Sequence, residues 1–249
     1  MNVNELISVL GAECFTGVPD SKLRPLVDYL MDTYGANSPA HLIAANEGSA
    51  AALAVGCHLA TGKVPLVYLQ NSGLGNLVNP LLSLLHREVY GIPCIFVIGW
   101  RGEPDLHDEP QHLVQGRLSL PLLETMGVRT MVLTRDSTPA EVAAWMATMH
   151  PHLKEGGQCA LLVRDGALDY PKRKYANAYT LRREDAIAQI LDAAGNASSS
   201  HQRARRGASC SSCGRNAARG TRMTSSPSAR WGMPLPLRSA LPCTVRSDA

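Results

Sequence analysis

The feature that most constrains the fold of this chain is a regular alternation of short apolar runs and helical periods over residues 1–195. Runs such as CIFVIG show no polar alternation, so both faces of the sheet that they form must be covered. The pattern therefore predicts an α/β fold with a doubly wound, six-stranded parallel sheet. The expected strands are Glu13–Val18, His41–Ala45, Pro65–Gln70, Pro93–Gly99, Arg129–Thr134 and Cys159–Arg164.

Capping residues mark the ends of several expected helices. Apolar residues spaced three and four apart in the first ten residues end at Gly11, which is a typical helix stop. Thr138-Pro139-Ala140-Glu141 is a capping box with proline at the first helical position. A last helix is expected near Leu181–Ala194, ending at Gly195.

The pattern is lost near Asn196. Residues 196–249 are dominated by serine, arginine, alanine, glycine and proline, and such a tail is expected to be mostly disordered. It contains nine arginines and one acid, which give it a net charge of +8. Because the whole chain has a net charge of +3, residues 1–195 carry a net charge of −5. The tail is either a natural basic segment or, as we prefer, a frameshifted start of a further domain. Resequencing the gene across the codon for Asn196 would distinguish the two.

The composition favours a soluble, cytoplasmic enzyme. No apolar run reaches the roughly 18 to 20 residues that a membrane span needs. The N-terminus has no basic region typical of a secretory signal. Seven cysteines at irregular spacings, in a chain without an export signal, predict reduced thiols.

The segment His41–Gln70 carries the first candidate chemical group. It is expected to form a strand, a helix and a strand, with Asn46-Glu47-Gly48 where the first strand meets the helix. Side chains at the carboxyl edge of a parallel sheet face the ligand crevice, so Glu47 is a candidate catalytic carboxylate. The alternative is structural, because a carboxylate in the first turn stabilises a helix by about 0.3 to 1 kcal/mol.

Two loops after the following strands are further candidates. Asn71-Ser72-Gly73-Leu74-Gly75-Asn76 is a glycine-rich turn, which either only connects two elements or lets the backbone approach a cofactor. It matches neither the GxGxxG nor the P-loop pattern. Residues 99–112 are dense in charged groups, as expected of a substrate wall, where Arg101 could bind an oxyanion in a bidentate manner. A lone arginine or histidine in such a loop is also commonly a surface group.

Seven motifs occur along the chain: GVPDS (Gly17–Ser21), ANEG (Ala45–Gly48), ATGKVPLVY (Ala60–Tyr68), QNSGLGN (Gln70–Asn76), GIP (Gly91–Pro93), GWRGEP (Gly99–Pro104) and DEPQH (Asp108–His112). In type and order they resemble the phosphonopyruvate decarboxylases, a branch of the thiamine-diphosphate-dependent decarboxylase family. The resemblance covers roughly residues 1–195. Sulfopyruvate decarboxylase is a close relative, and the last two motifs favour the phosphonate enzyme.

The resemblance implies a pyrimidine-binding domain over residues 1–195. It also implies decarboxylation of 3-phosphonopyruvate to phosphonoacetaldehyde and carbon dioxide, in phosphonate natural-product biosynthesis. Glu47 matches the glutamate that hydrogen-bonds the aminopyrimidine ring of thiamine diphosphate, where a desolvated carboxylate can share a proton. Asn71, Ser72 and Gly73 match a loop that passes beside that ring. The residues expected to border the substrate are Asp20, Lys22, Arg101, Gln111 and His112, with Arg101 and then Lys22 as phosphonate ligands.

The same resemblance implies a second domain, whose GDG motif helps to hold Mg²⁺ and the diphosphate. No GDG occurs in this sequence, and Arg164-Asp165-Gly166 is the nearest string. We therefore expect a partner domain or subunit to supply the Mg²⁺ and diphosphate site, and this chain alone to be inactive. A homo-oligomer is also expected, with no metal ligands in this chain.

Other functions stay open at this point. They are an alpha-type subunit of sulfopyruvate decarboxylase, a non-catalytic Rossmann-like nucleotide-binding module, and nucleic-acid binding by the arginine-rich tail. The Rossmann alternative lacks a phosphate-binding glycine pattern after the first strand, and the tail has Trp231 as its only aromatic residue. We expect neither nucleic acid nor a membrane as a partner. A zinc site is disfavoured because its candidate ligands are badly spaced, namely His201, Cys210, Cys213 and Cys243.

Overall fold

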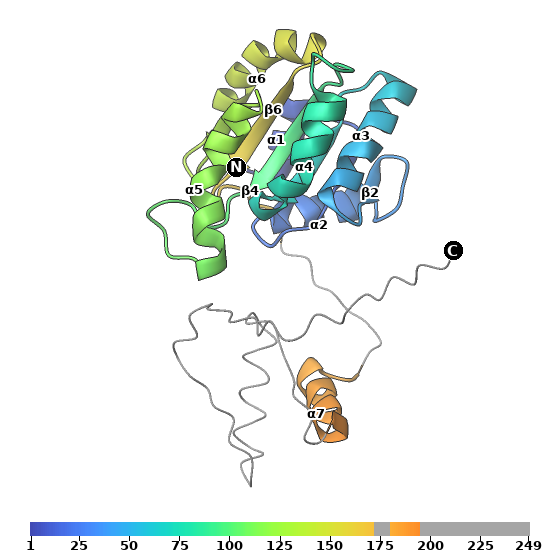
Figure 1. Ribbon diagram of the computed structural model, residues 1–249, viewed down its shortest axis with the longest axis vertical. Helices are drawn as coiled ribbons and strands as arrows, with labels where there is room; N and C mark the ends of the chain where they lie inside the picture. The colour runs from blue at the N-terminus through green and yellow to red at the C-terminus, as the bar shows by residue number, and fades with distance from the viewer. Residues whose placement is uncertain (172–179, 195–249) are drawn as a thin grey trace, which may run out of the picture. The chain divides into compact units, whose positions relative to one another are not determined.

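The computed structural model describes residues 1–171 and 180–194 of the chain, which divides into the units Met1–Lys174 and Tyr175–Ala249 (Figure 1). The strands are β1 (Phe15–Gly17), β2 (His41–Ile43), β3 (Leu66–Gln70), β4 (Cys94–Gly99), β5 (Arg129–Leu133) and β6 (Gln158–Val163). The helices of the first unit are α1 (Val3–Leu10), α2 (Arg24–Thr33), α3 (Glu47–Thr61), α4 (Leu74–Pro80), α5 (Pro110–Thr125) and α6 (Pro139–Lys154). Two short turns, η1 (Asn71–Gly73) and η2 (Leu81–Leu85), flank α4, and the second unit contributes α7 (Arg183–Ala194).

The six strands form one parallel sheet in the order β2-β1-β3-β4-β6-β5. This confirms the predicted doubly wound sheet, and the strand ends differ from the predicted ones by one or two residues. From β1 the chain moves outward to β2, then returns past β1 to β3 and continues in the other direction. The connections therefore diverge between β1 and β3, and open parallel sheets bind ligands at the carboxyl edge beside such a point.

Helices cover both faces of the sheet (Figure 1). On one face, buried residues of α1, α2 and α6 pack against β1, β3, β4 and β6. On the other face, buried residues of α3, α4, η2 and α5 form a second core with the alternate side chains of β3, β4 and β6. Every residue of β4 and β6 is buried, which explains why these strands read as continuous apolar runs.

The predicted helix ends agree with the structure. Gly11 adopts the left-handed conformation, with φ of 62°, directly after α1. Thr138 and Glu141 form the reciprocal capping box at the start of α6, and Pro139 is the first residue of that helix. Helix α7 begins at Arg183, within the segment predicted to be helical.

The point where the connections diverge depends on a glycine. Gly17 at the end of β1 pairs with Tyr68 of β3, and a Cβ atom at Gly17 would lie 2.1 Å from the Tyr68 backbone oxygen. Only glycine fits that approach, because real Cβ atoms do not come so close to a backbone oxygen. Tyr68 in turn has its hydroxyl 2.8 Å from Nε2 of the fully buried His41 on β2. The three strands are thereby joined near the candidate site.

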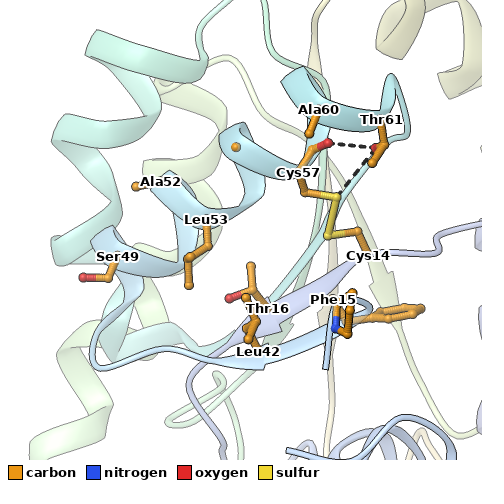
Figure 2. Close-up of a pocket in the computed structure, with 12 residues that line it drawn as sticks. Cys14, Phe15, Thr16, Leu42, Ser49, Ala52, Leu53, Cys57, Ala60 and Thr61 are labelled. Atoms are coloured by element: carbon orange, nitrogen blue, oxygen red, sulfur yellow. Dashed lines mark hydrogen bonds between the residues drawn. A yellow bond between two sulfur atoms is a disulfide. The ribbon is translucent and has the colours of Figure 1, made fainter. Parts of the chain in front are cut away.

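The expectation of reduced thiols is wrong for two cysteines. Cys14, just before β1, and Cys57 of α3 form a disulfide across 43 residues, whereas Cys94 and Cys159 are free and buried. Sequence spacing gave no indication of this pair, because the two residues meet only when α3 folds back over β1. Figure 2 shows the disulfide at one end of a hollow of about 680 Å³ between α3 and strands β1 and β2.

Several predictions lie outside the described residues. They concern the tail from Asn196 onward, including its disorder, its frameshifted origin and the zinc ligands expected there. The predicted domain boundary near Gly195 is also untested. Within residues 1–171 and 180–194, no helix is long and apolar enough to cross a membrane.

Two glycines hold the loop after β4 against α5. A Cβ atom at Gly116 of α5 would lie 1.6 Å from the backbone oxygen of Gly102. A Cβ atom at Gly102, whose φ is 64°, would lie 2.0 Å from the backbone oxygen of His112. Trp100 Nε1 also donates a hydrogen bond of 2.9 Å to the Gly116 oxygen. The loop therefore packs on the helix through its backbone.

Gly116→Ala should lower the free energy of unfolding by about 1 to 3 kcal/mol, because the added methyl group forces the loop and α5 apart. The matched control is Gly56→Ala in α3, where an added Cβ meets nothing within 4 Å. That change should stabilise the helix by up to about 1 kcal/mol. Urea unfolding measures both, and equal effects of the two substitutions would contradict the close packing.

Candidate functional site

Polar and charged residues gather where the parallel strands end, on both sides of the β1–β3 divergence. This edge is the expected ligand crevice of the fold. Five strands contribute to it through the residues that follow them or end them. These residues are Asp20 after β1, Glu47 after β2, Gln70 and Asn71 at and after β3, Arg101 after β4, and Asp165 after β6.

Glu47 is the first residue of α3, and the local sequence fixes it there. Asn46 is the N-cap, and its side chain accepts a hydrogen bond of 2.8 Å from the Ser49 amide. The Glu47 residue is only 9% exposed. One of its carboxylate oxygens, Oε2, accepts a hydrogen bond of 2.7 Å from Nδ2 of Asn76 in α4. A carboxylate largely removed from water thus lies at the sheet edge.

Gly73 forms the wall beside the other oxygen of Glu47. A Cβ atom at Gly73 would lie 2.2 Å from Oε1, so any other residue would displace the carboxylate. Among the described residues, Oε1 receives no side-chain hydrogen bond. This oxygen can accept a hydrogen bond from an N–H group of a ligand or share a proton with a ring nitrogen, which fits the aminopyrimidine expected from the sequence.

Asn71 is used to hold its own loop. Asn71 is fully buried, and its Nδ2 donates to the Arg101 backbone oxygen at 2.8 Å and to Ser119 Oγ at 2.9 Å. Its Oδ1 accepts from the Arg101 amide at 3.0 Å. Gln115 Nε2 also donates to the Asn71 backbone oxygen at 3.0 Å. These contacts join the end of β3 to the end of β4 and to α5, and they use both N–H groups of the Asn71 side chain.

The side chain of Gln70 links Ser72 to Asp20 by hydrogen bonds. The Ser72 hydroxyl donates to Gln70 Oε1 at 2.6 Å, and Gln70 Nε2 donates to Asp20 Oδ1. Asp20 is 8% exposed, and its Oδ2 accepts from the Lys22 amide at 3.0 Å. The Lys22 ammonium lies 3.3 Å from Asp165 Oδ1. A polar network thus crosses the divergence point from β1 to β3.

Arg101, the expected phosphonate ligand, is paired within the chain. Its Nε and Nη2 atoms donate to the two oxygens of Asp108 at 2.9 and 2.5 Å. Asp108 also accepts from the amides of Gly102 and Glu109, each at 2.8 Å. Burial alone would raise the pKa of Asp108, but the hydrogen bonds from Arg101 and the two amides outweigh it and hold that pKa well below its usual range. The hydrogen bond to Asp108 likewise raises the pKa of Arg101.

Gln111 and His112 lie in the first turn of α5, where Gln111 is exposed and His112 is half-buried. The backbone oxygen of His112 packs against Gly102, which places the pair on the same loop system as Arg101. The contacts therefore define three groups of predicted residues. They are Glu47 with Gly73, the network that contains Asp20, Lys22 and Ser72, and the loop after β4 with the start of α5.

Sequence reasoning did not identify several residues that hold these groups. Asn76 falls within the glycine-rich turn, but only the fold places its amide against Glu47. Asp108 and Ser119 are likewise brought to Arg101 and Asn71 by the return of the chain along α5. The hollow in Figure 2 is also separate from the site, since its lining residues do not include Glu47.

Comparison with known proteins shows the family to which the chain belongs. The family described as "Thiamine pyrophosphate enzyme, N-terminal TPP binding domain" matches residues 3–123. Sulfopyruvate decarboxylase subunit alpha of Methanococcus maripaludis is 32% identical over 133 residues, which are 51% of this chain and 75% of that protein. The chain belongs to the thiamine pyrophosphate-dependent decarboxylase family.

Phosphonopyruvate decarboxylase of Streptomyces viridochromogenes is 38% identical over 152 residues, which are 59% of this chain and 36% of that protein. The chain thus matches only about a third of that enzyme's length. A solved 4-hydroxybenzoylformate decarboxylase of Rhodococcus jostii RHA1, which is thiamine diphosphate-dependent, is 20% identical. The match covers 76% of this chain and 36% of that one, with a TM-score of 0.46.

Asp108→Asn should lower the free energy of unfolding at pH 7 by about 1 to 3 kcal/mol, because the Arg101 guanidinium loses its charged partner. Asp108 has a lowered pKa in the folded chain, so its contribution is complete above the ordinary carboxyl pKa of about 4. It is lost as the pH falls below that value toward the lowered pKa.

The difference between wild type and Asp108→Asn should therefore shrink when urea unfolding is repeated at pH values below about 4. Asp136→Asn, at an exposed position, is the control and should change stability by less than about 0.5 kcal/mol at either pH. A difference for Asp108→Asn that stays constant across this range would contradict the ion pair's role.

Proposed function

We propose that this chain forms the pyrimidine-binding side of a thiamine-diphosphate-dependent decarboxylase that acts on 3-phosphonopyruvate. The products would be phosphonoacetaldehyde and carbon dioxide, in phosphonate natural-product biosynthesis in the cytoplasm. The observation that carries the proposal is the buried carboxylate of Glu47, held at the carboxyl edge of the sheet with one oxygen that accepts no side-chain hydrogen bond from residues 1–171 and 180–194. The likeness to relatives named phosphonopyruvate decarboxylase supports the choice of substrate.

Glu47 has the central role in this proposal. When bound, thiamine diphosphate supplies an electron sink for the decarboxylation of a 2-keto acid. Glu47 Oε1 would hydrogen-bond a pyrimidine ring nitrogen and hold or return a proton at that atom. The limited water around Glu47 strengthens such a hydrogen bond, since polar interactions gain strength at low local dielectric. Gly73 leaves room for the carboxylate, and Asn71 fixes the loop that contains Gly73.

The substrate would carry two anionic groups, and the chain offers cations nearby on the same edge. Arg101 keeps N–H groups beyond the two that bind Asp108, so it could bind a phosphonate while staying paired. Lys22 is the second candidate, next to Asp20 and Asp165. Gln111 and His112 at the start of α5 would border the same space.

Sulfopyruvate is the second candidate substrate. A specific observation favours it, because the chain spans 75% of a sulfopyruvate decarboxylase subunit alpha but 36% of a phosphonopyruvate decarboxylase. A sulfonate and a phosphonate are both tetrahedral oxyanions, so the pairing of Arg101 with Asp108 does not separate them. The relative's designation as a subunit also supports a partner that would hold Mg²⁺ and the diphosphate, within a larger oligomer.

The test is carbon dioxide release from phosphonopyruvate and from sulfopyruvate, with thiamine diphosphate, Mg²⁺ and a diphosphate-binding partner polypeptide of a relative. We expect activity only when the chain and the partner are mixed, and a higher rate with phosphonopyruvate. Glu47→Gln, which keeps the size of the side chain but removes its charge, should lower the rate at least about 100-fold.

Glu155→Gln in the loop after α6 is the control and should leave the rate unchanged. A preference for sulfopyruvate would replace the substrate assignment and keep the rest. No turnover of either acid by a folded mixture, or full activity of Glu47→Gln, would contradict the proposed function.

A further inference from the structure

In the part of the chain that the structure describes, Asn76 is the side chain that hydrogen-bonds the Glu47 carboxylate. Its Nδ2 donates to Glu47 Oε2 at 2.7 Å, across 29 residues of sequence. A hydrogen bond to a charged acceptor of this length is among the stronger ones in proteins. Asn76 comes from α4 and Glu47 from α3, so the bond also joins the two helices that flank the glycine-rich turn.

The two oxygens of the Glu47 carboxylate have different surroundings. Oε2 is bound by Asn76, whereas Oε1 lies against Gly73, where the missing side chain leaves its space. The backbone oxygen of Asn76 is also close to α3, since a Cβ atom at Gly48 would lie 3.2 Å from it. Rotation of the carboxylate would break the Asn76 bond, so its plane is fixed with Oε1 as the oxygen available to a ligand.

We propose that Asn76 is a positioning residue, which orients Glu47 so that Oε1 meets the pyrimidine ring of thiamine diphosphate. The inference rests on the proposed function, because it assigns Oε1 to the cofactor. Asn76 itself is largely exposed on α4, unlike Glu47. Its removal should therefore disturb the orientation of Glu47 far more than the stability of the fold.

The chain offers a matched control three residues away. Asn79 is also exposed on α4, and its side chain accepts a hydrogen bond of 3.1 Å from Ser83 instead of contacting Glu47. Asn76→Ala and Asn79→Ala remove the same group from the same helix. Asn76→Asp adds a third case, because at neutral pH it replaces the donor with a carboxylate beside Glu47 and keeps the shape.

The experiment follows the carboxyl carbon of Glu47 by NMR in the whole chain labelled with ¹³C-glutamate, with Glu47→Gln to assign the resonance. Without ligand, Asn76→Ala should shift this resonance and Asn79→Ala should not. Titration with thiamine diphosphate, with Mg²⁺ and the diphosphate-binding partner polypeptide present, should then move the wild-type and Asn79→Ala resonances at similar concentrations. Asn76→Ala should need about tenfold more cofactor, the loss expected for a hydrogen bond to a charged group.

Asn76→Asp should bind more weakly than Asn76→Ala at pH 7, and its deficit relative to Asn76→Ala should shrink toward pH 4, where the introduced acid regains a proton to donate. A merely structural role would not produce that dependence. A Glu47 resonance unchanged by Asn76→Ala, or equal cofactor affinity of Asn76→Ala and wild type, would overturn the inference alone. A wild-type Glu47 resonance that does not move when thiamine diphosphate is added to the mixture of chain and partner would overturn the proposed function, even if Asn76→Ala still shifted the unliganded resonance.

Discussion

The carboxylate of Glu47, nearly withdrawn from water, is the group about which this edge of the fold is arranged. A charged group can stay buried only where neighbours compensate the lost hydration. The N-terminal end of α3 and the amide of Asn76 supply that compensation, and the absence of a side chain at Gly73 leaves room for the carboxylate. Each comes from a segment that follows β2 or β3, so the parallel sheet and its order are what bring them to one place.

A second set of contacts keeps the rest of the edge in register with Glu47. Asn71 ties the turn after β3 to the backbone of Arg101, and Asp108 ties Arg101 to the start of α5. The close packing of Gly102 on Gly116 holds the same loop against that helix. A change in the loop after β4 would therefore reach Gly73, and through it the carboxylate. The candidate substrate ligands and the candidate catalytic group are therefore held by the same set of contacts.

The sequence predicted the fold well and the site in part. Unbroken apolar runs indicate strands that are buried on both faces, and capping residues such as Gly11 and Thr138 mark helix ends. Both signals are local in the sequence, so the strands and helix ends could be predicted from them. Glu47 could also be singled out as a candidate from the sequence, because a strand–helix junction is recognised from neighbouring residues. The pairing of Arg101 with Asp108, the burial of Asn71, and the Cys14–Cys57 disulfide were not, because each depends on segments that meet only through the fold. The predicted roles toward ligands stay predictions for all of these residues: Glu47, Asn71, Ser72, Gly73, Asp20, Lys22, Arg101, Gln111 and His112.

The most direct test is a crystal structure of the chain with a diphosphate-binding partner and thiamine diphosphate. The decisive quantity is the distance between Glu47 Oε1 and the nearest pyrimidine ring nitrogen. The account predicts a hydrogen-bond distance of about 2.6 to 3.2 Å, with Asn76 still bound to Oε2. A pyrimidine ring that lies elsewhere, with no nitrogen within about 4 Å of Glu47, would contradict it.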